Sequence, residues 1–389
     1  MTTAPRPDPT RTFRVHPACR VRGPGDLAAV MDVLARGVEF AMGPGGMTPL
    51  PAGEPGFFRS ATGGTTGPAK AIRRSHHSWI ASFAVNAGVL ALTPQDSYGV
   101  LGPAEHSLSL YAMAEAAYLG ADIHAVAGLG ARSQVQALAG ASVVYATPTQ
   151  LRLLVATGAV LPDPRHVLCG GGRLGADLRA AVAAMCPAAE VREFYGAAET
   201  SFIAWGDGTG PEGSVGRAYP GVSLRIDADV GQVGDIWVKS PYLAEGYVTE
   251  DTTPLNRVDG YVSLGELGRI DADGYLTVLG RRNRMVTIAD QNVFPEAIEE
   301  HCLAHPGVDF CAVVPVPDRL RGQVLVAAIG AAAGRCPGPE LAETLRVACR
   351  DAFGALAAPR RIEILDDFPL TAAGKPDYVC IARRMDGGA

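Results

Sequence analysis

Apolar side chains recur at helical spacing near the start of the chain. In the segment 26–42 they form one broad face, and residues 78–92 repeat the pattern, so both segments are predicted to be amphipathic helices. Further along, strand-like runs lie at 98–101, 142–145 and 167–168, with helical patterns at 108–119 and 132–139. Strands that alternate with helices are typical of a largely parallel sheet, so we expect an α/β fold for this part of the chain.

The pattern changes after residue 213. Short alternating runs at 222–226, 235–238 and 275–279, with Gly or Pro between them, predict antiparallel strands. After Gly280 the pattern predicts helices near 295–304 and 338–353 and strands near 310–315, 323–329 and 361–365. We therefore predict a large N-terminal domain of mixed sheets and helices over residues 1–280. A small, mobile α+β domain is predicted over residues 281–389, after an arginine-rich polar hinge.

Length and composition narrow the class of protein. The 389 residues exceed one ordinary hydrophobic core, and 48% hydrophobic with 19% charged residues fits a globular protein. The net charge is −6, and no run of Lys and Arg indicates nucleic acid or an anionic membrane as a partner. The cysteines are scattered without metal-ligand spacing, so reduced thiols are expected. Because the chain lacks a signal-peptide core and any long apolar stretch, we expect a cytoplasmic protein with no membrane contact.

The most informative segment runs from residue 62 to residue 70. Its glycines let backbone N–H groups approach an anion, and its hydroxyls and lysine suit phosphate. The residues are Thr62, Gly63, Gly64, Thr65, Thr66, Gly67 and Lys70. Lys70 does not directly follow the second glycine of a Walker A pattern, so the segment is not that motif. We interpret it as a loop that holds a polyphosphate, and the alternative is a Gly/Thr surface linker.

Further segments carry groups suited to binding or catalysis. His106 follows one apolar strand pattern, and the glycines Gly170, Gly171 and Gly172 follow another, where the backbone can closely approach a ring or a phosphate. Tyr195 and Gly196 are followed by Glu199, which combines an aromatic ring suited to stacking with a carboxylate suited to Mg²⁺.

Taken in order, these motifs resemble those of the adenylate-forming superfamily, which includes acyl-CoA synthetases, nonribosomal peptide adenylation domains and luciferases. The phosphate loop resembles Thr-Ser-Gly-Thr-Thr-Gly-x-Pro-Lys, and residues 195–199 resemble Tyr-Gly-x-Thr-Glu. Residues 280–299 resemble the hinge motif that starts with Gly-Arg and ends with Pro-x-Glu-Ile-Glu. Residues 369–375 resemble Pro-x-Thr-x-x-Gly-Lys. The resemblance extends over residues 57–378.

The resemblance implies a two-step reaction. A carboxylate attacks the α-phosphate of MgATP, which gives acyl-AMP and pyrophosphate, and a nucleophile then displaces AMP. The phosphate loop would bind the outer phosphates, Glu199 would bind Mg²⁺, and Lys375 would bridge the carboxylate and the α-phosphate. The nucleoside would be bound by Tyr195 and Gly196 beside the 170–172 glycines, and by Glu266 and Arg281 at the ribose hydroxyls.

The resemblance also implies an acyl pocket near the His106 segment. The predicted lining is Ser107, Tyr111, Ala197 and Ala198, and no Asp is present where amino-acid-activating relatives carry one. These residues favour an aryl or hydroxyaryl acid. His106 is predicted to be a gate between this pocket and the path of a thiol. The alternative is an ordinary polar residue beside a strand.

Several positions depart from the family pattern. Ala198 replaces a threonine, Glu266 replaces an aspartate, and Asp290 replaces a glycine that lines the path of CoA in CoA ligases. A carboxylate at position 290 would narrow that path. CoA is the expected acceptor, and an amine or hydroxyl acceptor is the alternative, as in synthetases of natural-product biosynthesis. A non-catalytic nucleotide-binding module is a further hypothesis, which Glu199 and Lys375 disfavour.

The phosphate loop lies closer to the N-terminus than it does in full-length family members. A large part of the usual N-terminal subdomain is therefore expected to be missing. Apolar surface left uncovered by this shortening favours a homodimer.

Overall fold

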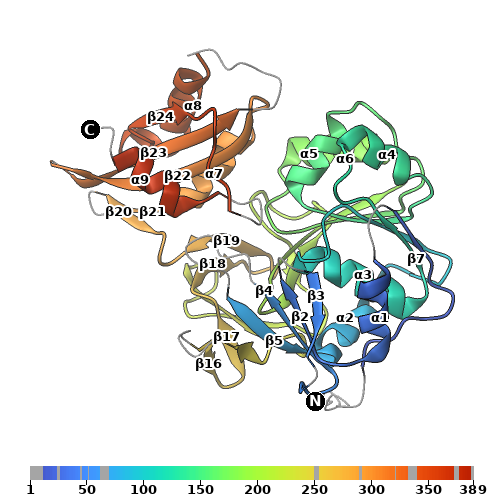
Figure 1. The fold of residues 1–389 in the computed structure, drawn as a ribbon. Coiled ribbons are helices and arrows are strands. Elements are labelled where there is room, and N and C mark those ends of the chain that lie inside the picture. The colour runs from blue at the N-terminus through green and yellow to red at the C-terminus, as the bar shows by residue number, and fades with distance from the viewer. Residues whose placement is uncertain are drawn as a thin grey trace.

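Figure 1 shows the computed structural model of the chain as two lobes. The structure describes residues 12–23, 27–43, 46–50, 52–61, 70–248, 254–288, 291–319, 321–331, 340–371 and 376–386. The larger lobe contains the elements up to β19 (Leu276–Arg281), and the smaller lobe contains those from β20 (Val286–Ile288) onward.

A mostly parallel sheet forms the centre of the larger lobe. Its strands follow the order β1-β7-β6-β8-β9-β10-β11-β12 and are parallel up to β10, after which β11 and β12 are antiparallel. In that order the bounds are Val21–Arg22, Asp122–Ala125, Ser97–Val100, Val143–Ala146, His166–Cys169, Glu190–Ala197, Ser201–Gly206 and Arg217–Ala218.

Helices cover both faces of this sheet (Figure 1). One core cluster contains side chains of α1 (Ala28–Arg36), α2 (His76–Val89) and α3 (Ser107–Leu119). The other contains side chains of α5 (Pro148–Val155) and α6 (Ala176–Met185), with α4 (Ala131–Ala137) packed against it. Successive residues of β8 point to opposite clusters, as strand geometry requires. Local signals set the helix starts: Ser75 caps α2, and Thr147 with Gln150 forms a capping box at α5.

Two further sheets complete the larger lobe. The first has the order β15-β5-β4-β2-β3, with bounds Gly246–Tyr247, Ala71–Ser75, Phe57–Ala61, Phe40–Gly43 and Gly46–Pro49. The second has the order β16-β17-β14-β18-β19, with β13 paired to β14. Its remaining bounds are Asn256–Val258, Tyr261–Ser263, Gly234–Lys239, Glu266–Ile270 and Ser223–Ile226.

The smaller lobe has its own core. A hairpin of β20 and β21 (Gln291–Val293) precedes α7 (Pro295–Leu303), and the long strands β22 (Val308–Asp318) and β23 (Gly322–Ala331) pair with β24 (Arg361–Ile364). Helices α8 (Glu340–Ala357) and α9 (Tyr378–Asp386) pack with α7 on this sheet. The core clusters of this lobe start at Val286, whereas those of the larger lobe end at Val278. A boundary at 280–284 stays a prediction that this division supports.

The predicted fold class is confirmed, but one helix is wrong. The helix expected over 26–42 ends at Arg36, because Gly37 adopts a left-handed conformation with φ of 61°, and Phe40–Gly43 is a strand. The first sheet was missed as a whole, since none of its strands is longer than five residues. None of the described helices is long and apolar enough to cross a bilayer.

Candidate active site

Several predicted site residues lie outside the described part of the chain. These are Thr62, Gly63, Gly64, Thr65, Thr66 and Gly67 of the phosphate loop, the predicted catalytic Lys375, and Asp290. The other predicted residues are described. Lys70 directly precedes β5, Tyr195 and Gly196 lie near the end of β10, and Glu266 pairs with Arg281 across β18 and β19.

A tight hairpin turn between β10 and β11 carries Glu199. The turn is closed by a hydrogen bond from the Thr200 N–H to the Ala197 carbonyl at 3.2 Å. The next residue, Ser201, has φ of 56°, a conformation that costs a non-glycine residue free energy and is common at functional sites. A Cβ at Gly196 would lie 2.0 Å from the Ser201 carbonyl oxygen, so only glycine fits there. These constraints hold the turn and its carboxylate in one conformation.

Strand β15, the residues just before it and Lys70 lie beside this turn. The Tyr247 hydroxyl donates to Glu199 Oε1 at 3.0 Å, and the Ala244 N–H donates to the Glu199 carbonyl at 2.8 Å. Lys70 Nζ lies 5.0 Å from the centre of the Tyr247 ring. Burial, with the Glu199 carboxylate beside it, raises the pKa of Tyr247, so its hydroxyl stays a donor at neutral pH. The predicted phosphate-loop lysine and the predicted metal ligand thus share one contact cluster.

A buried guanidinium lies behind the same turn. Arg74, on β5, is 1% exposed and donates from Nη2 to the Ala198 carbonyl at 2.6 Å. Its Nη1 donates to the Tyr242 carbonyl at 2.5 Å and to Ser78 Oγ at 3.0 Å. Burial lowers the pKa of Arg74 to about 9, which still leaves the group cationic at neutral pH.

The residues predicted to bind the nucleoside form a second cluster. The Tyr195 hydroxyl donates to the Glu266 carboxylate, and Arg281 Nε lies 3.6 Å from Glu266 Oε1. Burial and the Glu266 charge raise the pKa of Tyr195 well above its usual value, so the phenol remains protonated. Their roles toward a nucleotide stay predictions.

The 170–172 glycines lie directly against this strand. A Cβ at Gly170 would lie 2.1 Å from the ring of Phe194, and Gly171 has φ of 82°, so both positions require glycine. Since Phe194 precedes Tyr195, the glycine segment and the tyrosine are brought together by the parallel pairing of β9 and β10.

The predicted acyl-pocket residues differ in accessibility. His106 adopts an extended conformation directly before α3, and Ser107 begins that helix, half-buried like Ala197 and Ala198. Tyr111 is only 5% exposed, and its hydroxyl lies 2.8 Å from Ser82 Oγ. In this conformation Tyr111 offers a ring rather than a hydroxyl to a ligand, and the pocket assignment stays a prediction.

Deeper in the core, Glu115 is fully buried in a network of hydroxyl and amide donors. Its carboxylate oxygens accept from the Tyr145 hydroxyl at 2.6 Å, from Asn86 Nδ2 at 2.8 Å and from the Tyr98 hydroxyl at 3.2 Å. Burial raises the pKa of Glu115 to about 7, although these donors favour the charged form.

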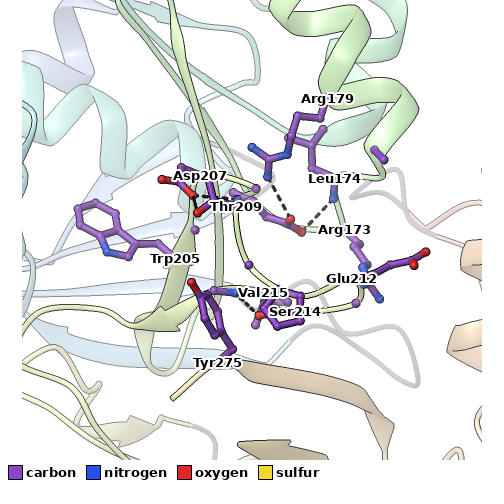
Figure 2. Close-up of a pocket in the computed structure, with 18 of the residues that line it drawn as sticks. Arg173, Leu174, Arg179, Trp205, Asp207, Thr209, Glu212, Ser214, Val215 and Tyr275 are labelled. Atoms are coloured by element: carbon purple, nitrogen blue, oxygen red, sulfur yellow. Dashed lines mark hydrogen bonds and ion pairs between the residues drawn. The ribbon is translucent and has the colours of Figure 1, made fainter. Parts of the chain in front are cut away.

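A cavity of about 410 Å³ is lined by residues of the larger lobe and by Glu300 of the smaller lobe. Figure 2 shows part of its lining. Its wall begins at Arg173, directly after the 170–172 glycines, and includes the start of α6, the loop after β11 and Tyr275. Arg179 lies 3.6 Å from Glu193, and Arg173 donates to Glu300 of α7 in the smaller lobe at 2.7 Å. The residues that line this cavity include none of those predicted from the sequence.

The donor set around Glu199 fits Mg²⁺ held with a nucleotide. Mg²⁺ is usually bound by one or two carboxylates together with substrate phosphates and water, rather than by a cage of protein ligands. Within the described ranges no group of three or more His, Cys, Asp or Glu side chains forms such a cage. A single constrained carboxylate near Lys70 is therefore compatible with a metal that enters with ATP.

Two residues of this region were missed at the sequence level. Arg74 gave a usable signal, because it is an arginine on a strand directly after the phosphate loop. Tyr247 gave none, since its position beside Glu199 depends on the pairing of β15 with β5 across a long stretch of sequence.

Comparison with protein families identifies two regions of the chain. Residues 60–248 match the AMP-binding enzyme family, and residues 297–375 match the AMP-binding enzyme C-terminal domain. Among curated proteins, the chain is 29% identical over 340 residues to an uncharacterized acyl-CoA ligase, YhfT, of Bacillus subtilis. That alignment covers 84% of this chain and 68% of YhfT. The chain spans 29–67% of the length of other curated relatives that it matches.

Solved structures share the fold over nearly the whole chain. An ATP-bound chimera of RpMatB and BxBclM matches with a TM-score of 0.73 at 25% identity, over 95% of this chain and 79% of the chimera. The amide bond synthetase McbA from Marinactinospora thermotolerans matches with a TM-score of 0.71 at 26% identity, over 95% of this chain and 80% of McbA.

Proposed function

We propose that this chain, which belongs to the adenylate-forming superfamily of AMP-binding enzymes and is an AMP-forming ligase, activates a carboxylic acid with ATP as acyl-AMP. It then releases pyrophosphate and transfers the acyl group to CoA. Relatives named as acyl-CoA ligases support CoA as the acceptor.

The observation that carries this proposal is the cluster around Glu199. A carboxylate on a rigid turn lies beside Tyr247 and Lys70, and the adjacent strand leads to the Tyr195–Glu266–Arg281 cluster. The first cluster suits the metal-bound triphosphate end of a nucleotide, and the second suits its nucleoside end. The two clusters therefore follow one another as the two ends of a nucleotide do. Adenylyl transfer depends on such positioning and on neutralising charge.

Each group has a distinct task in the proposed reaction. The glycine-threonine loop and Lys70 would bind the outer phosphates, and Glu199 would hold Mg²⁺, which would supply positive charge to the phosphates. Glu266 accepts hydrogen bonds from the ribose hydroxyls while Arg281 and Tyr195 hold its carboxylate. Lys375 brings its ammonium to the acid carboxylate and the α-phosphate, where it stabilises charge that develops in the transition state.

We propose an aryl or hydroxyaryl acid as the substrate. Small, half-buried side chains stand at 107, 197 and 198, and the Tyr111 ring packs edge-on against Phe202, with the ring centres 5.2 Å apart. A flat ring fits beside such aromatic side chains better than a flexible chain does. His106 would be the gate between this pocket and the acceptor.

A second candidate is an amide or ester synthetase of natural-product biosynthesis that uses an amine or hydroxyl acceptor without CoA. The likeness to McbA and the carboxylate of Asp290 favour it. Product analysis with and without CoA separates the two candidates, because acyl transfer to an amine that is independent of CoA supports only the second.

The proposal extends to the setting of the enzyme. We propose a cytoplasmic homodimer, which light scattering on the purified chain and fractionation of its host cells test. A monomeric mass at micromolar concentration contradicts the dimer.

Acid-dependent exchange of labelled pyrophosphate into ATP tests the activity. A screen of aromatic and aliphatic acids should give exchange with at least one aryl acid, and Lys375→Ala should abolish exchange while ATP still binds. Normal exchange in that variant contradicts the role of Lys375. ATP binding without exchange by the unmodified chain, for every acid, indicates a non-catalytic binding module.

A further inference from the structure

Arg74 is a cation in the interior of the larger lobe. Its side chain is 1% exposed, and within the described part of the chain it takes part in no ion pair. The next arginine, Arg73, by contrast pairs with Glu39 and Glu54 and is partly exposed. A buried charge without a counter-ion lowers stability, so its contacts need an explanation other than general packing.

The contacts of Arg74 converge on the segments that hold Glu199. Its Nη2 donates to the carbonyl of Ala198, the residue before Glu199, and its Nη1 donates to the carbonyl of Tyr242. Two residues after Tyr242, the Ala244 N–H donates to the Glu199 carbonyl. The rigid guanidinium of Arg74 thus connects the turn that carries Glu199 with the segment that leads to Tyr247. Tyr247 in turn donates a hydrogen bond to the Glu199 carboxylate.

The charge matters as well as the geometry. A neutral donor of similar size could satisfy the same carbonyls, but only a cation is also attracted by the carboxylates nearby: burial lowers the pKa of Arg74, and the charges of Glu199 and Glu245 oppose that change. Arg74 would therefore hold the turn that carries Glu199 in place without touching the substrate.

We propose that Arg74 is a positioning residue that fixes the Ala198–Glu199 turn and the Tyr242–Tyr247 segment, so that Glu199 is preorganised to bind the metal of MgATP. The proposal rests on the proposed function, because it assigns a metal to Glu199. Removal of such supporting groups typically lowers metal affinity about 10-fold to 100-fold.

The test compares Arg74→Met and Arg74→Lys with the control Arg165→Met in the full chain. Arg165 directly precedes β9 and pairs with the buried Asp96 at 2.6 Å, so its loss also removes a guanidinium from a buried partner. Mn²⁺ binding in the presence of ATP, measured by electron paramagnetic resonance, and amide hydrogen exchange in peptides covering 195–201 and 242–248 are the readouts.

For Arg74→Met we expect about 10-fold weaker Mn²⁺ binding and faster hydrogen exchange in both peptides, with partial recovery in Arg74→Lys. Arg165→Met should leave both readouts as in the unmodified chain. Equal Mn²⁺ affinity in Arg74→Met and Arg165→Met overturns the proposal, as does unchanged exchange at 195–201. If Arg74→Met does not fold, Arg74→Lys decides: weaker Mn²⁺ binding with faster exchange confined to 195–201 and 242–248 supports the proposal, and wild-type Mn²⁺ affinity or faster exchange elsewhere in the chain overturns it.

Failure of the proposed reaction can be distinguished from failure of the proposed role of Arg74. A chain that binds Mn²⁺ with ATP yet exchanges no pyrophosphate contradicts the proposed reaction, while the binding and hydrogen-exchange readouts still decide the role of Arg74. A chain that does not bind Mn²⁺ with ATP overturns both.

Discussion

At the residue scale, the position of Glu199 depends on groups from distant parts of the chain. Its carboxylate accepts from Tyr247, its carbonyl accepts from Ala244, and Arg74 holds the preceding carbonyl. The local motif indicates the tyrosine and the carboxylate of 195–199, because those residue types suit nucleotide chemistry wherever they occur. It cannot indicate Tyr247 or Arg74, since their proximity arises only when β5, β15 and the hairpin assemble.

Replacement of Glu199 by Gln should lower acid-dependent pyrophosphate exchange about 100-fold or more, because the amide keeps the size of the side chain but removes the charge that binds the metal. The measurement is the exchange rate over a range of Mg²⁺ concentrations, and high Mg²⁺ should restore part of the activity. Glu245→Gln is the matched control, since Glu245 is exposed and lies on the same adjoining segment. Equal losses in both variants would mean that Glu199 does not bind the metal.

At the scale of elements, α2, α3, β6 and β8 meet around the buried Glu115. Burial raises the pKa of Glu115 from 4.5 in the unfolded chain to about 7 in the folded protein, so the folded state binds more protons between these values. The free energy of unfolding should therefore fall as pH rises from about 4.5 to about 7, and this contribution is constant on either side of that window.

Glu115→Gln should remove this fall, because the amide stays neutral at every pH. One pKa unit corresponds to about 1.4 kcal/mol, so the difference between the variant and the unmodified chain should change by a few kcal/mol across the window. Urea unfolding at pH 5 and pH 8 measures it. A parallel dependence in both proteins would show that Glu115 does not titrate in this range.

Element types followed from the sequence where strand-like and helical patterns alternate along the chain. The helices at 107–119 and 131–137 and the strands at 97–100, 143–146 and 166–169 lie within a few residues of their predicted places. The segment 26–42 was misread because α1 and β2 are both apolar and only Gly37 separates them. Strands β2 to β5 were missed, since their pairing partners rather than their own pattern make them strands.

At the scale of the whole molecule, the predicted hinge can be placed more narrowly. Arg284 is held within the smaller lobe, where it bonds to Glu299 at 2.7 and 3.2 Å and lies 4.0 Å from the centre of the Tyr378 ring. Rotation of the small lobe should therefore occur before Arg284. Tyr378 lies three residues after Lys375, so we expect the lysine to move with the lobe.

Asn283→Pro tests this hinge. In the described structure the Asn283 N–H has no partner, whereas the Arg282 and Arg284 N–H groups bond to the carbonyls of Gly265 and Arg281. Proline there removes no hydrogen bond but fixes φ, so acyl transfer should fall about tenfold while pyrophosphate exchange changes little. Asn283→Ala is the control, and equal loss of both half-reactions in the proline variant contradicts a hinge at this position.

The junction between the lobes also carries ion pairs that water reaches. Arg173 pairs with Glu300, and Arg282 forms two hydrogen bonds to Asp235 at 3.0 and 2.6 Å while it stays mostly exposed. Dissolved salt screens such charges over about 8 Å at physiological ionic strength, but it has little effect on buried ones. The ionic strength of the buffer should thus change how readily the two lobes separate. Turnover rates measured at low and at high salt would then reflect different populations of joined and separated lobes.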